Sequence, residues 1–248
     1  TIGFGEIPYP FTDAQRMWAL IFIYITVATW IYTIGALIRL WQNETLQKAL
    51  AENRFQRQVR QISDPFFVVC GYGDTGSRLV KSLRKRLIRA SVLDLKQDRI
   101  DALMLAEHPL FLPGLQADAS TPRNLVLAGI MHPLCKSVVA LTDDNAVNLH
   151  IAITVKVLTP ETKVICRADS HEIEANMASF GTDAIIDPFD CFAKDLGLAV
   201  DYPYQYMLSD WFRNESGDTL APVMQLPKGR WILCGFGRFG RAIHRELL

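Results

Sequence analysis

Hydrophobic and polar residues are distributed very differently in the first forty residues and in the rest of the chain. The run Met17–Ile38 contains no charged residue. As an α-helix it would be roughly 33 Å long, enough to cross a hydrocarbon core of about 30 Å. A signal peptide has a shorter apolar core, a basic start and small residues at its end. Here Arg39, Leu40 and Trp41 follow instead, so the run is better interpreted as a membrane helix.

Basic residues are rarer before this run than after it, which predicts that its C-terminal end faces the cytoplasm. Residues 42–64 are then polar and contain neither glycine nor proline, with a loosely helical spacing of Leu46, Leu50, Val59 and Ile62. This pattern predicts a solvent-exposed helical linker between the membrane and a cytoplasmic domain.

From residue 65 onward, short apolar runs rich in β-formers alternate with amphipathic helices. We expect strands at 66–70, 90–95, 108–112, 136–142, 163–168 and 183–187, and helices at 75–87, 97–108, 121–130, 145–158, 171–181 and 191–200. This alternation is typical of a Rossmann-like, doubly wound α/β domain, in which helices cover both faces of a parallel sheet. We assign it to residues 65–201.

An internal repeat indicates a second copy of the same domain. The stretch FFVVCGYGDTG, ending at Gly76, returns as RWILCGFGRFG, ending at Gly240. Residues 230–248 therefore look like the start of the second domain, and we expect the chain to be a fragment of a longer protein. The connecting segment 202–229 begins with aromatic residues that either pack against the sheet or form a domain or subunit interface.

The composition of the chain argues against several classes of function but does not by itself identify one. The chain has 26 basic and 26 acidic residues, so its net charge does not favour nucleic-acid binding. The five cysteines form no CxxC motif and are expected to be reduced and buried, and the five histidines show no metal-ligand spacing. No catalytic set emerges, so we expect a binding protein rather than an enzyme.

The strongest soluble motif is the glycine pattern of Gly71, Gly73 and Gly76, between an expected strand and an expected helix. In the dinucleotide-binding fingerprint these glycines permit a tight turn, close approach of a pyrophosphate, and helix–strand packing, in that order. Asp94, at the end of the next strand, would accept hydrogen bonds from an adenosine ribose and repel a 2′-phosphate. NAD, ADP or ATP therefore fits better than NADP.

Asp74 lies inside this loop, where a carboxylate is unfavourable for phosphate unless a cation intervenes or the side chain turns away to cap the helix. The second loop has Arg238 at the same place. The alternative is a Rossmann-like domain whose loop binds nothing tightly.

Polar residues also stand where other strands end, which is where open α/β sheets bind ligands. There Asp118 could bond an adenine or ribose and Arg167 a phosphate, although each could equally be a cap or turn residue. The expected nucleotide site comprises Gly71, Gly73, Asp74, Thr75, Gly76, Asp94, Leu95, Asp118, Ala119, Thr142, Asp143 and Arg167.

The first five residues, TIGFG, resemble the selectivity filter of potassium channels, whose loops read TVGYG. The resemblance implies that carbonyl oxygens of this stretch, with the Thr1 hydroxyl, replace the hydration shell of K⁺. The residues that would hold the ion are Thr1, Ile2, Gly3, Phe4 and Gly5. One such strand cannot encircle an ion, so four subunits are required. On this view residues 1–41 are the filter and inner helix of a pore.

Residues 66 to about 200 resemble the RCK domain, the regulator of K⁺ conductance found below prokaryotic channel pores. The resemblance implies a multi-pass channel subunit in a prokaryotic cell membrane, in contact with lipid, with its RCK domains in the cytoplasm. It also implies a homotetramer whose eight RCK domains form a gating ring that a nucleotide opens or closes.

Calcium-gated members of this family carry two carboxylates one residue apart after the fifth strand, where this chain has Arg167 and Asp169. The resemblance therefore favours a nucleotide over Ca²⁺, although Ca²⁺ stays open as a second ligand. Two other interpretations also stay open. One is a membrane-tethered NAD-dependent oxidoreductase, and the other is a regulatory subunit of a K⁺ transporter, which usually lacks a pore of its own.

Overall fold

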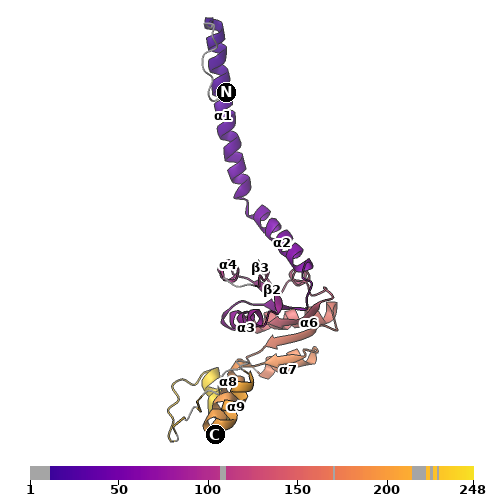
Figure 1. The fold of residues 1–248 in the computed structure, drawn as a ribbon, viewed down its shortest axis with the longest axis vertical. Coiled ribbons are helices and arrows are strands. Elements are labelled where there is room, and N and C mark those ends of the chain that lie inside the picture. Colours follow the sequence, from indigo (N-terminus) through magenta and orange to yellow (C-terminus); the bar gives the residue numbers. More distant parts are fainter. Residues whose placement is uncertain (1–11, 107–109, 170, 214–221, 224–225, 228) are drawn as a thin grey trace. The chain divides into compact units, whose positions relative to one another are not determined.

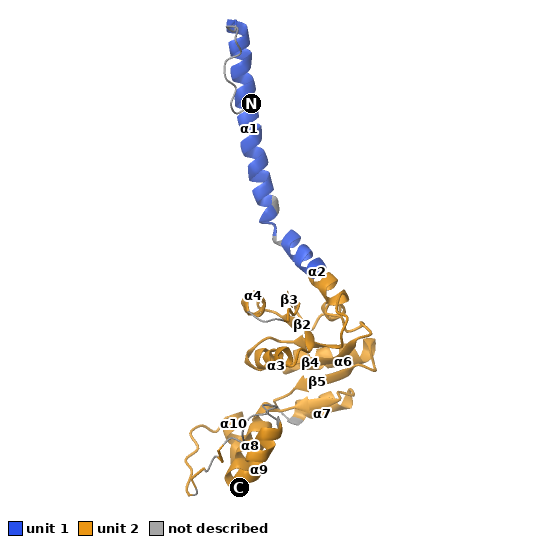
Figure 2. Ribbon diagram, in the orientation of Figure 1, with its two compact units in different colours: residues 1–54 blue, residues 55–248 orange. Residues whose placement is uncertain are grey.

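The structure is a computed structural model that describes residues 12–106, 110–169, 171–213, 222–223, 226–227 and 229–248. The chain divides into two compact units, Thr1–Arg54 and Phe55–Leu248 (Figure 2). The five residues that resemble a selectivity filter, Thr1 to Gly5, lie outside the described residues.

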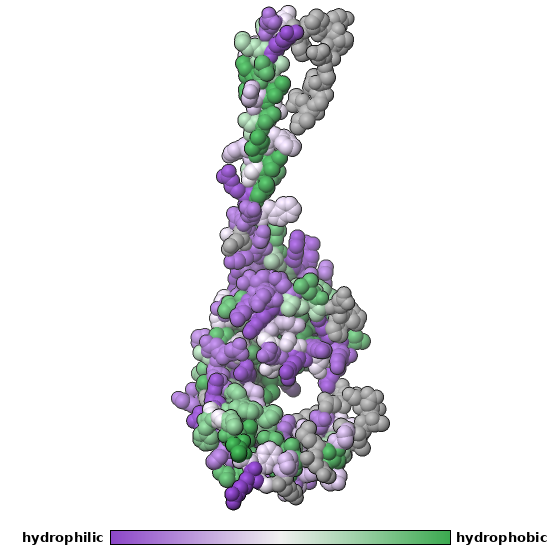
Figure 3. All heavy atoms as spheres, turned by 90° about the vertical axis from the view of Figure 1, so that its left-hand side faces the viewer, coloured by the Kyte–Doolittle hydropathy of each residue, from purple (hydrophilic) through white to green (hydrophobic). Residues whose placement is uncertain are grey.

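The first unit is dominated by helix α1 (Asp13–Trp41). Its segment Asp13–Arg39 is long and apolar enough to cross a membrane, and none of it is buried by other parts of the chain. Large apolar side chains therefore cover its exposed surface (Figure 3). The hydroxyls of Thr26, Thr29 and Thr33 each donate to the carbonyl four residues earlier, so these polar groups need no outside partner.

Helix α2 (Glu44–Arg60) lies where the sequence predicts a solvent-exposed helix, but part of this helical segment is buried. Phe55, Val59 and Ile62 are buried and belong to the same hydrophobic cluster as Phe66 of the first strand. They recur at intervals of four and three residues, so they share one face of the helical segment. The second unit accordingly begins at Phe55 rather than at the expected residue 65.

The second unit is built on one parallel sheet whose strand order is β3-β2-β1-β4-β5-β6 (Figure 1). Its strands are β1 (Phe66–Cys70), β2 (Arg89–Asp94), β3 (Gly114–Gln116), β4 (Cys135–Ala140), β5 (Lys163–Arg167) and β6 (Ala184–Ile186). This order confirms the doubly wound fold. The direction of strand addition reverses between β1 and β4, which is the topological switch point where such sheets bind ligands.

Helices cover both faces of the sheet, as the alternation of side chains along β1 requires. Val68 and Cys70 join one buried cluster with residues of α5, α6 and α7, whereas Val69 joins a second cluster with residues of α3 and α4. The helices are α3 (Asp74–Lys85), α4 (Gln97–Leu105), α5 (Pro122–Leu127), α6 (Asn145–Leu158), α7 (His171–Ser179), α8 (Pro188–Asp201), α9 (Pro203–Arg213) and α10 (Arg238–Glu246).

One predicted strand is wrong. The third strand of the chain is at Gly114–Gln116 and not at 108–112, because the residues that pair with Val92, Leu93 and Asp94 of β2 are the later ones. The start of the repeat, 230–234, is no strand in the described structure, and Ile232 there is 89% exposed. A strand needs a hydrogen-bonded neighbour, and none of the described strands pairs with this segment.

The end of the chain nevertheless packs in an ordered way. Helix α10 lies against α8, where Ala193, Ala242 and Ile243 form a small buried cluster. The guanidinium of Arg245 also donates to the carboxylate of Asp190 at 2.6 Å. The second glycine motif is thus held on the first domain.

Candidate functional site

The loop between β1 and α3 contains two glycines that the backbone itself requires. Gly71 has φ +100°, and a Cβ there would lie 2.9 Å from the Leu141 carbonyl. A Cβ on Gly76 would overlap the carbonyl oxygen of Gly71. The tight turn predicted for Gly71 is present, whereas the close contact of Gly76 is with the loop rather than with a strand.

Gly73 is different, because its backbone imposes no such demand. Its φ is −78°, and a Cβ there would meet only the guanidinium of Arg99, with 3.4 Å to the nearest atom. The lack of a side chain at Gly73 leaves space between the loop and Arg99. This is the place where the fingerprint brings a pyrophosphate close to the backbone.

Helix α3 begins directly after Gly73. Its first internal hydrogen bond runs from the Ser77 N–H to the Gly73 carbonyl at 2.8 Å, so the amides before Ser77 have no partner within the helix. Unpaired amides and the helix dipole favour an anion at this end. Asp74 and Thr75 are exposed in the first turn, and Asp74 does not take the cap position, which Gly73 occupies without a side-chain bond.

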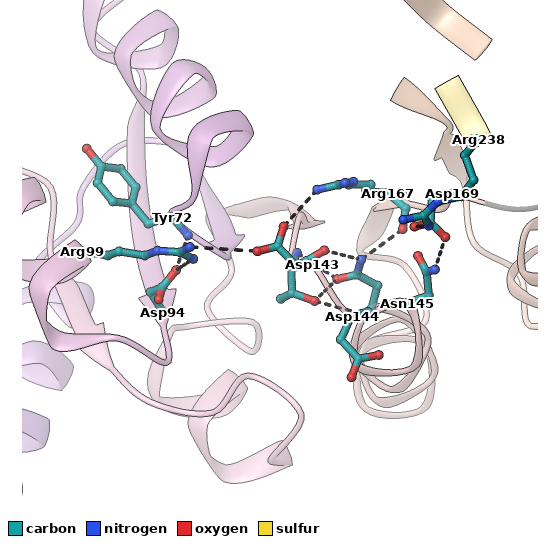
Figure 4. A network of polar contacts seen from close by, with 11 residues as sticks. Tyr72, Asp94, Arg99, Asp143, Asp144, Asn145, Arg167, Asp169 and Arg238 are labelled. Atoms are coloured by element: carbon teal, nitrogen blue, oxygen red, sulfur yellow. Dashed lines mark hydrogen bonds and ion pairs between the residues drawn. The ribbon is translucent and has the colours of Figure 1, made fainter. Parts of the chain in front are cut away.

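Asp94 at the end of β2 is 5% exposed and holds several donors. Its carboxylate accepts the backbone N–H of Tyr72 at 2.6 Å and that of Lys96 at 2.8 Å. The guanidinium of Arg99 lies 3.3 Å from the same carboxylate (Figure 4). Asp94 therefore connects the glycine loop, its own strand end and the start of α4.

A cavity of about 270 Å³ opens beside this carboxylate at the C-terminal edge of the sheet. Its lining residues are Gly71, Leu93, Asp94, Leu95, Lys96, Arg99, Ala117, Asp118, Ala119, Thr142, Asp143, Asp144 and Val147. Of the residues expected from the sequence, the structure brings Gly71, Asp94, Leu95, Asp118, Ala119, Thr142 and Asp143 into this lining. Gly73, Asp74, Thr75, Gly76 and Arg167 are not part of it.

Aspartates outnumber cations in the lining, yet most already accept local hydrogen bonds. Asp118 accepts the N–H of Ser120 at 2.8 Å, and Asp144 caps α6 by accepting the N–H of Ala146 at 2.8 Å. The cap and turn roles foreseen as the alternative thus hold for the Asp118 carboxylate. An ionised carboxylate has about four lone-pair sites, so these side chains can also accept hydrogen bonds from hydroxyl and amino groups of a ligand.

Arg99 is a candidate binding residue that the sequence did not single out. It lies between two carboxylates, 3.3 Å from Asp94 and 4.0 Å from Asp143 (Figure 4). With Lys96 it supplies positive charge beside the glycine loop and offsets the acidic lining. The only sequence signal was a basic residue five positions after Asp94, in the first turn of the following helix.

A second polar cluster joins the ends of β4 and β5. Arg167 donates to Asp143 at 3.2 Å. Asn148, which is fully buried, donates to the carbonyls of Thr142 and Arg167, each at 3.1 Å. Arg167 therefore lies at the site edge that the sequence predicted, but it pairs with a carboxylate there.

Asp169, two residues beyond Arg167, accepts hydrogen bonds from Asn145 and from Arg238 (Figure 4). Arg238 belongs to the second glycine motif, at the position that Asp74 occupies in the first. The two glycine motifs are therefore connected through the loop that carries Asp143 and Asn145.

The described residues of this region offer few groups for metal binding or thiol reactions. Among the described residues there is no group of three or more histidine, cysteine, aspartate or glutamate side chains that could hold a metal ion. Burial raises the pKa of the Cys166 thiol to about 12 and that of Cys135 to about 11, so both remain protonated. Cys191 and Cys234 are exposed, contrary to the expectation that the cysteines are buried.

Comparison with known proteins supports this description of the second unit. Residues 67–188 match the TrkA-N domain family. The crystal structure of the TrkA-N domain of inner membrane protein ybaL from Escherichia coli superposes with a TM-score of 0.50 at 18% identity. That match covers 55% of this chain and 96% of the other, so the two share a fold.

Two relatives are longer than this chain. An uncharacterized protein of Methanothermus fervidus is 24% identical over 204 residues, covering 82% of this chain and 31% of the relative. Potassium channel protein 1 of Methanocaldococcus jannaschii is 20% identical over 189 residues, covering 76% of this chain and 55% of the relative. The chain thus spans about half the length of the channel protein and less of the other relative.

Proposed function

Residues 67–188 form a TrkA-N domain, and from this premise we propose that the chain is part of a potassium channel subunit regulated by a nucleotide. The observation that carries the proposal is the cavity between Gly71 and Asp94, at the switch point of a doubly wound sheet. Similarity to potassium channel protein 1 supports the channel assignment.

The cavity offers a suitable contact for each part of an adenine nucleotide. Asp94 and Asp118 would accept hydrogen bonds from ribose hydroxyls or from the adenine amino group. Apolar lining from Leu95, Ala119 and Val147 would contact the base. The phosphates would lie along the loop at Gly73, toward the amides of α3 and the guanidinium of Arg99. NAD, ADP and ATP all contain these parts.

The membrane assignment rests on α1. A helix whose apolar side chains are exposed over its length is stable in a hydrocarbon environment, provided that its polar groups are satisfied internally. The threonine hydroxyls of α1 meet this condition through their bonds to backbone carbonyls. We place the TrkA-N domain in the cytoplasm of a prokaryotic cell, because basic residues follow the helix.

The pore itself is proposed from the sequence alone. The stretch Thr1–Gly5 would supply the K⁺ ligands, and four subunits would be needed to surround the ion. Eight RCK-type domains would then form a ring below the pore. A nucleotide can change K⁺ conductance only by the difference in its affinity for the two shapes of that ring.

We propose binding without turnover. The lining of the cavity contains no histidine and no cysteine, so the groups that most often move protons or attack substrates are missing from this set of described residues. A membrane-tethered oxidoreductase would consume NADH, which the absorbance of the reduced cofactor reports. A stable absorbance in the presence of the protein supports a sensor, and steady oxidation supports the enzyme.

Titration calorimetry tests the nucleotide site. The chain, kept in detergent because of α1, is titrated separately with ADP and with NAD. Saturable binding of at least one of them is expected. If neither binds at millimolar concentration, the nucleotide part of the proposal is wrong. A transporter regulatory subunit would also bind nucleotide, and only K⁺ flux through the reconstituted protein separates it from a channel.

A further inference from the structure

The cavity occupies only one half of the crevice that a dinucleotide would need. In doubly wound sheets a dinucleotide lies across the switch point, with one nucleotide on each side. Here the lining comes from the ends of β1, β2, β3 and β4 and from the first turns of α4 and α6. None of its residues belongs to β5, β6 or the described segments that follow them.

On the other side of the switch point, polar side chains of the molecule are bonded to one another. Arg167 is paired with Asp143 at 3.2 Å, and the fully buried Asn148 ties the ends of β4 and β5 together. Asp169, whose side chain is 9% exposed, accepts hydrogen bonds from Asn145 and Arg238. The second nucleotide of a dinucleotide, on this side of the switch point, would meet these contacts with its ribose and base.

Arg238 is held in this position from several directions. Its guanidinium carbon lies 5.4 Å from the centre of the Phe189 ring. Its helix α10 packs on α8 through Ala242 and Ile243. A ligand that needs this half of the crevice would have to displace Arg238, whose side chain is 56% exposed but is bonded to Asp169 and lies over the Phe189 ring.

We propose that this site takes an adenine mononucleotide with its phosphates, such as ADP, and rejects the dinucleotide NAD. The specificity-determining contact is the one between Arg238 and Asp169. The inference rests on the nucleotide site proposed above and narrows its ligand. The cavity volume agrees, since about 270 Å³ is just below the range of roughly 300–1,000 Å³ that is usual for pockets of drug-sized ligands.

The charges around the cavity favour the same ligand. The Arg99 guanidinium lies beside Gly73 of the glycine loop, where the phosphates of ADP would end in solvent, and Lys96 lines the same cavity. Arg99 now bridges Asp94 and Asp143 and can exchange these partners for phosphate oxygens. The nicotinamide end of NAD has no comparable place in the described part of the cavity.

Competitive titration of the chain in detergent tests the inference. We expect ADP to bind at least tenfold more tightly than NAD. In Arg238→Ala the affinity for NAD should rise to within about threefold of that for ADP, whereas the ADP affinity stays unchanged. Arg241→Ala is the matched control, because Arg241 is an exposed arginine of the same helix, and it should leave both affinities as they are.

Thermal unfolding of each variant accompanies the titrations. If Arg238→Ala is destabilised, Asp169→Asn is used instead, since it weakens the same contact from the other side and keeps a polar group there. Equal affinities for ADP and NAD in the unchanged chain would overturn the inference while the nucleotide site stands. A preference for ADP that persists in folded Arg238→Ala and Asp169→Asn would overturn the role of Arg238. Binding of neither nucleotide would overturn the proposed function together with this inference.

Discussion

The backbone N–H of Tyr72 donates a 2.6 Å hydrogen bond to the carboxylate of Asp94. This bond fastens the glycine loop to the end of the neighbouring strand β2. The same carboxylate accepts the N–H of Lys96 and contacts Arg99. Asp94 is therefore a structural support of the loop as well as a wall of the cavity.

We expect Asp94→Ala to lower both stability and nucleotide affinity. The N–H groups of Tyr72 and Lys96 would lose a charged acceptor, and a hydrogen bond to a charged group typically contributes about 1.5–3 kcal/mol. Urea unfolding measures the first effect, and titration with ADP should show at least a tenfold weaker affinity. Asp98→Ala, an exposed aspartate of the same segment, should change neither. An Asp94→Ala variant with unchanged ADP affinity would contradict the assigned site.

Substitutions at two glycines of the loop should have different effects: Gly76→Ala should lower stability, and Gly73→Ala should lower ADP affinity. A Cβ at Gly76 would overlap the Gly71 carbonyl oxygen, so we expect Gly76→Ala to reduce the free energy of unfolding by at least the 1–3 kcal/mol typical of overpacking. A Cβ at Gly73 would meet only the flexible guanidinium of Arg99. Gly73→Ala should therefore fold almost normally. It should nevertheless bind ADP more weakly than the unchanged chain, because its methyl group would lie where the phosphates approach the loop.

Unfolding and ADP titration of both variants check this contrast. The account would be contradicted if Gly73→Ala bound ADP as well as the unchanged chain, because the loop would then not be in contact with phosphate. It would also be contradicted if Gly76→Ala had normal stability.

The packing of the C-terminal part of α2 within the second unit can be tested with two apolar residues of the same helix. Phe55 is 2% exposed, whereas Leu50 is 47% exposed. Phe55→Ala should cost about 3–5 kcal/mol, as is usual for a buried phenylalanine, and Leu50→Ala no more than about 0.5 kcal/mol. Similar losses in the two variants, measured by urea unfolding in detergent, would mean that Phe55 is not packed in the core of the second unit.

The ion pair of Lys156 and Asp183 predicts a pH-dependent stability. Burial acts to raise the pKa of Asp183, but hydrogen bonds from Lys156 and from the Val164 N–H hold that pKa below its ordinary value. A group with a lowered pKa stabilises the fold above its unfolded pKa, and this contribution is lost as the pH falls through the folded one.

The melting temperature of Asp183→Asn should therefore be below that of the unchanged chain at pH 7. This difference in melting temperature should be small, because the Asp183 side chain is 38% exposed. The difference should disappear as the pH falls below about 4, where the carboxylate becomes protonated. A gap of constant size over this range would show that the carboxylate charge does not contribute.

Much of the fold was predictable because its signals are local. The alternation of apolar strands and amphipathic helices correctly gave the parallel sheet, and Asp94 could be chosen because it ends a strand at the fingerprint distance from Gly76. The short strand β3 was misplaced, since only its pairing with β2 selects Gly114–Gln116. The burial of Phe55 was missed because polar residues surround it in the sequence.

The parts of the site that escaped prediction depend on contacts between distant segments. Arg99 matters because it lies between Asp94 and Asp143, which are on different strand ends. Arg238 follows Asp169 by 69 positions and reaches it only because α10 packs on α8. No periodicity or spacing in the sequence contains this information.

The central claim is that a nucleotide in this cavity sets K⁺ conductance, and K⁺ flux from liposomes tests it most directly. The protein is reconstituted, and flux is recorded with and without ADP, for the unchanged protein and for Gly73→Ala. The account predicts K⁺-selective flux that ADP changes several-fold, with a weaker response in Gly73→Ala at the same ADP concentration. Flux that is identical with and without ADP and NAD, or an absence of K⁺ selectivity, would contradict it.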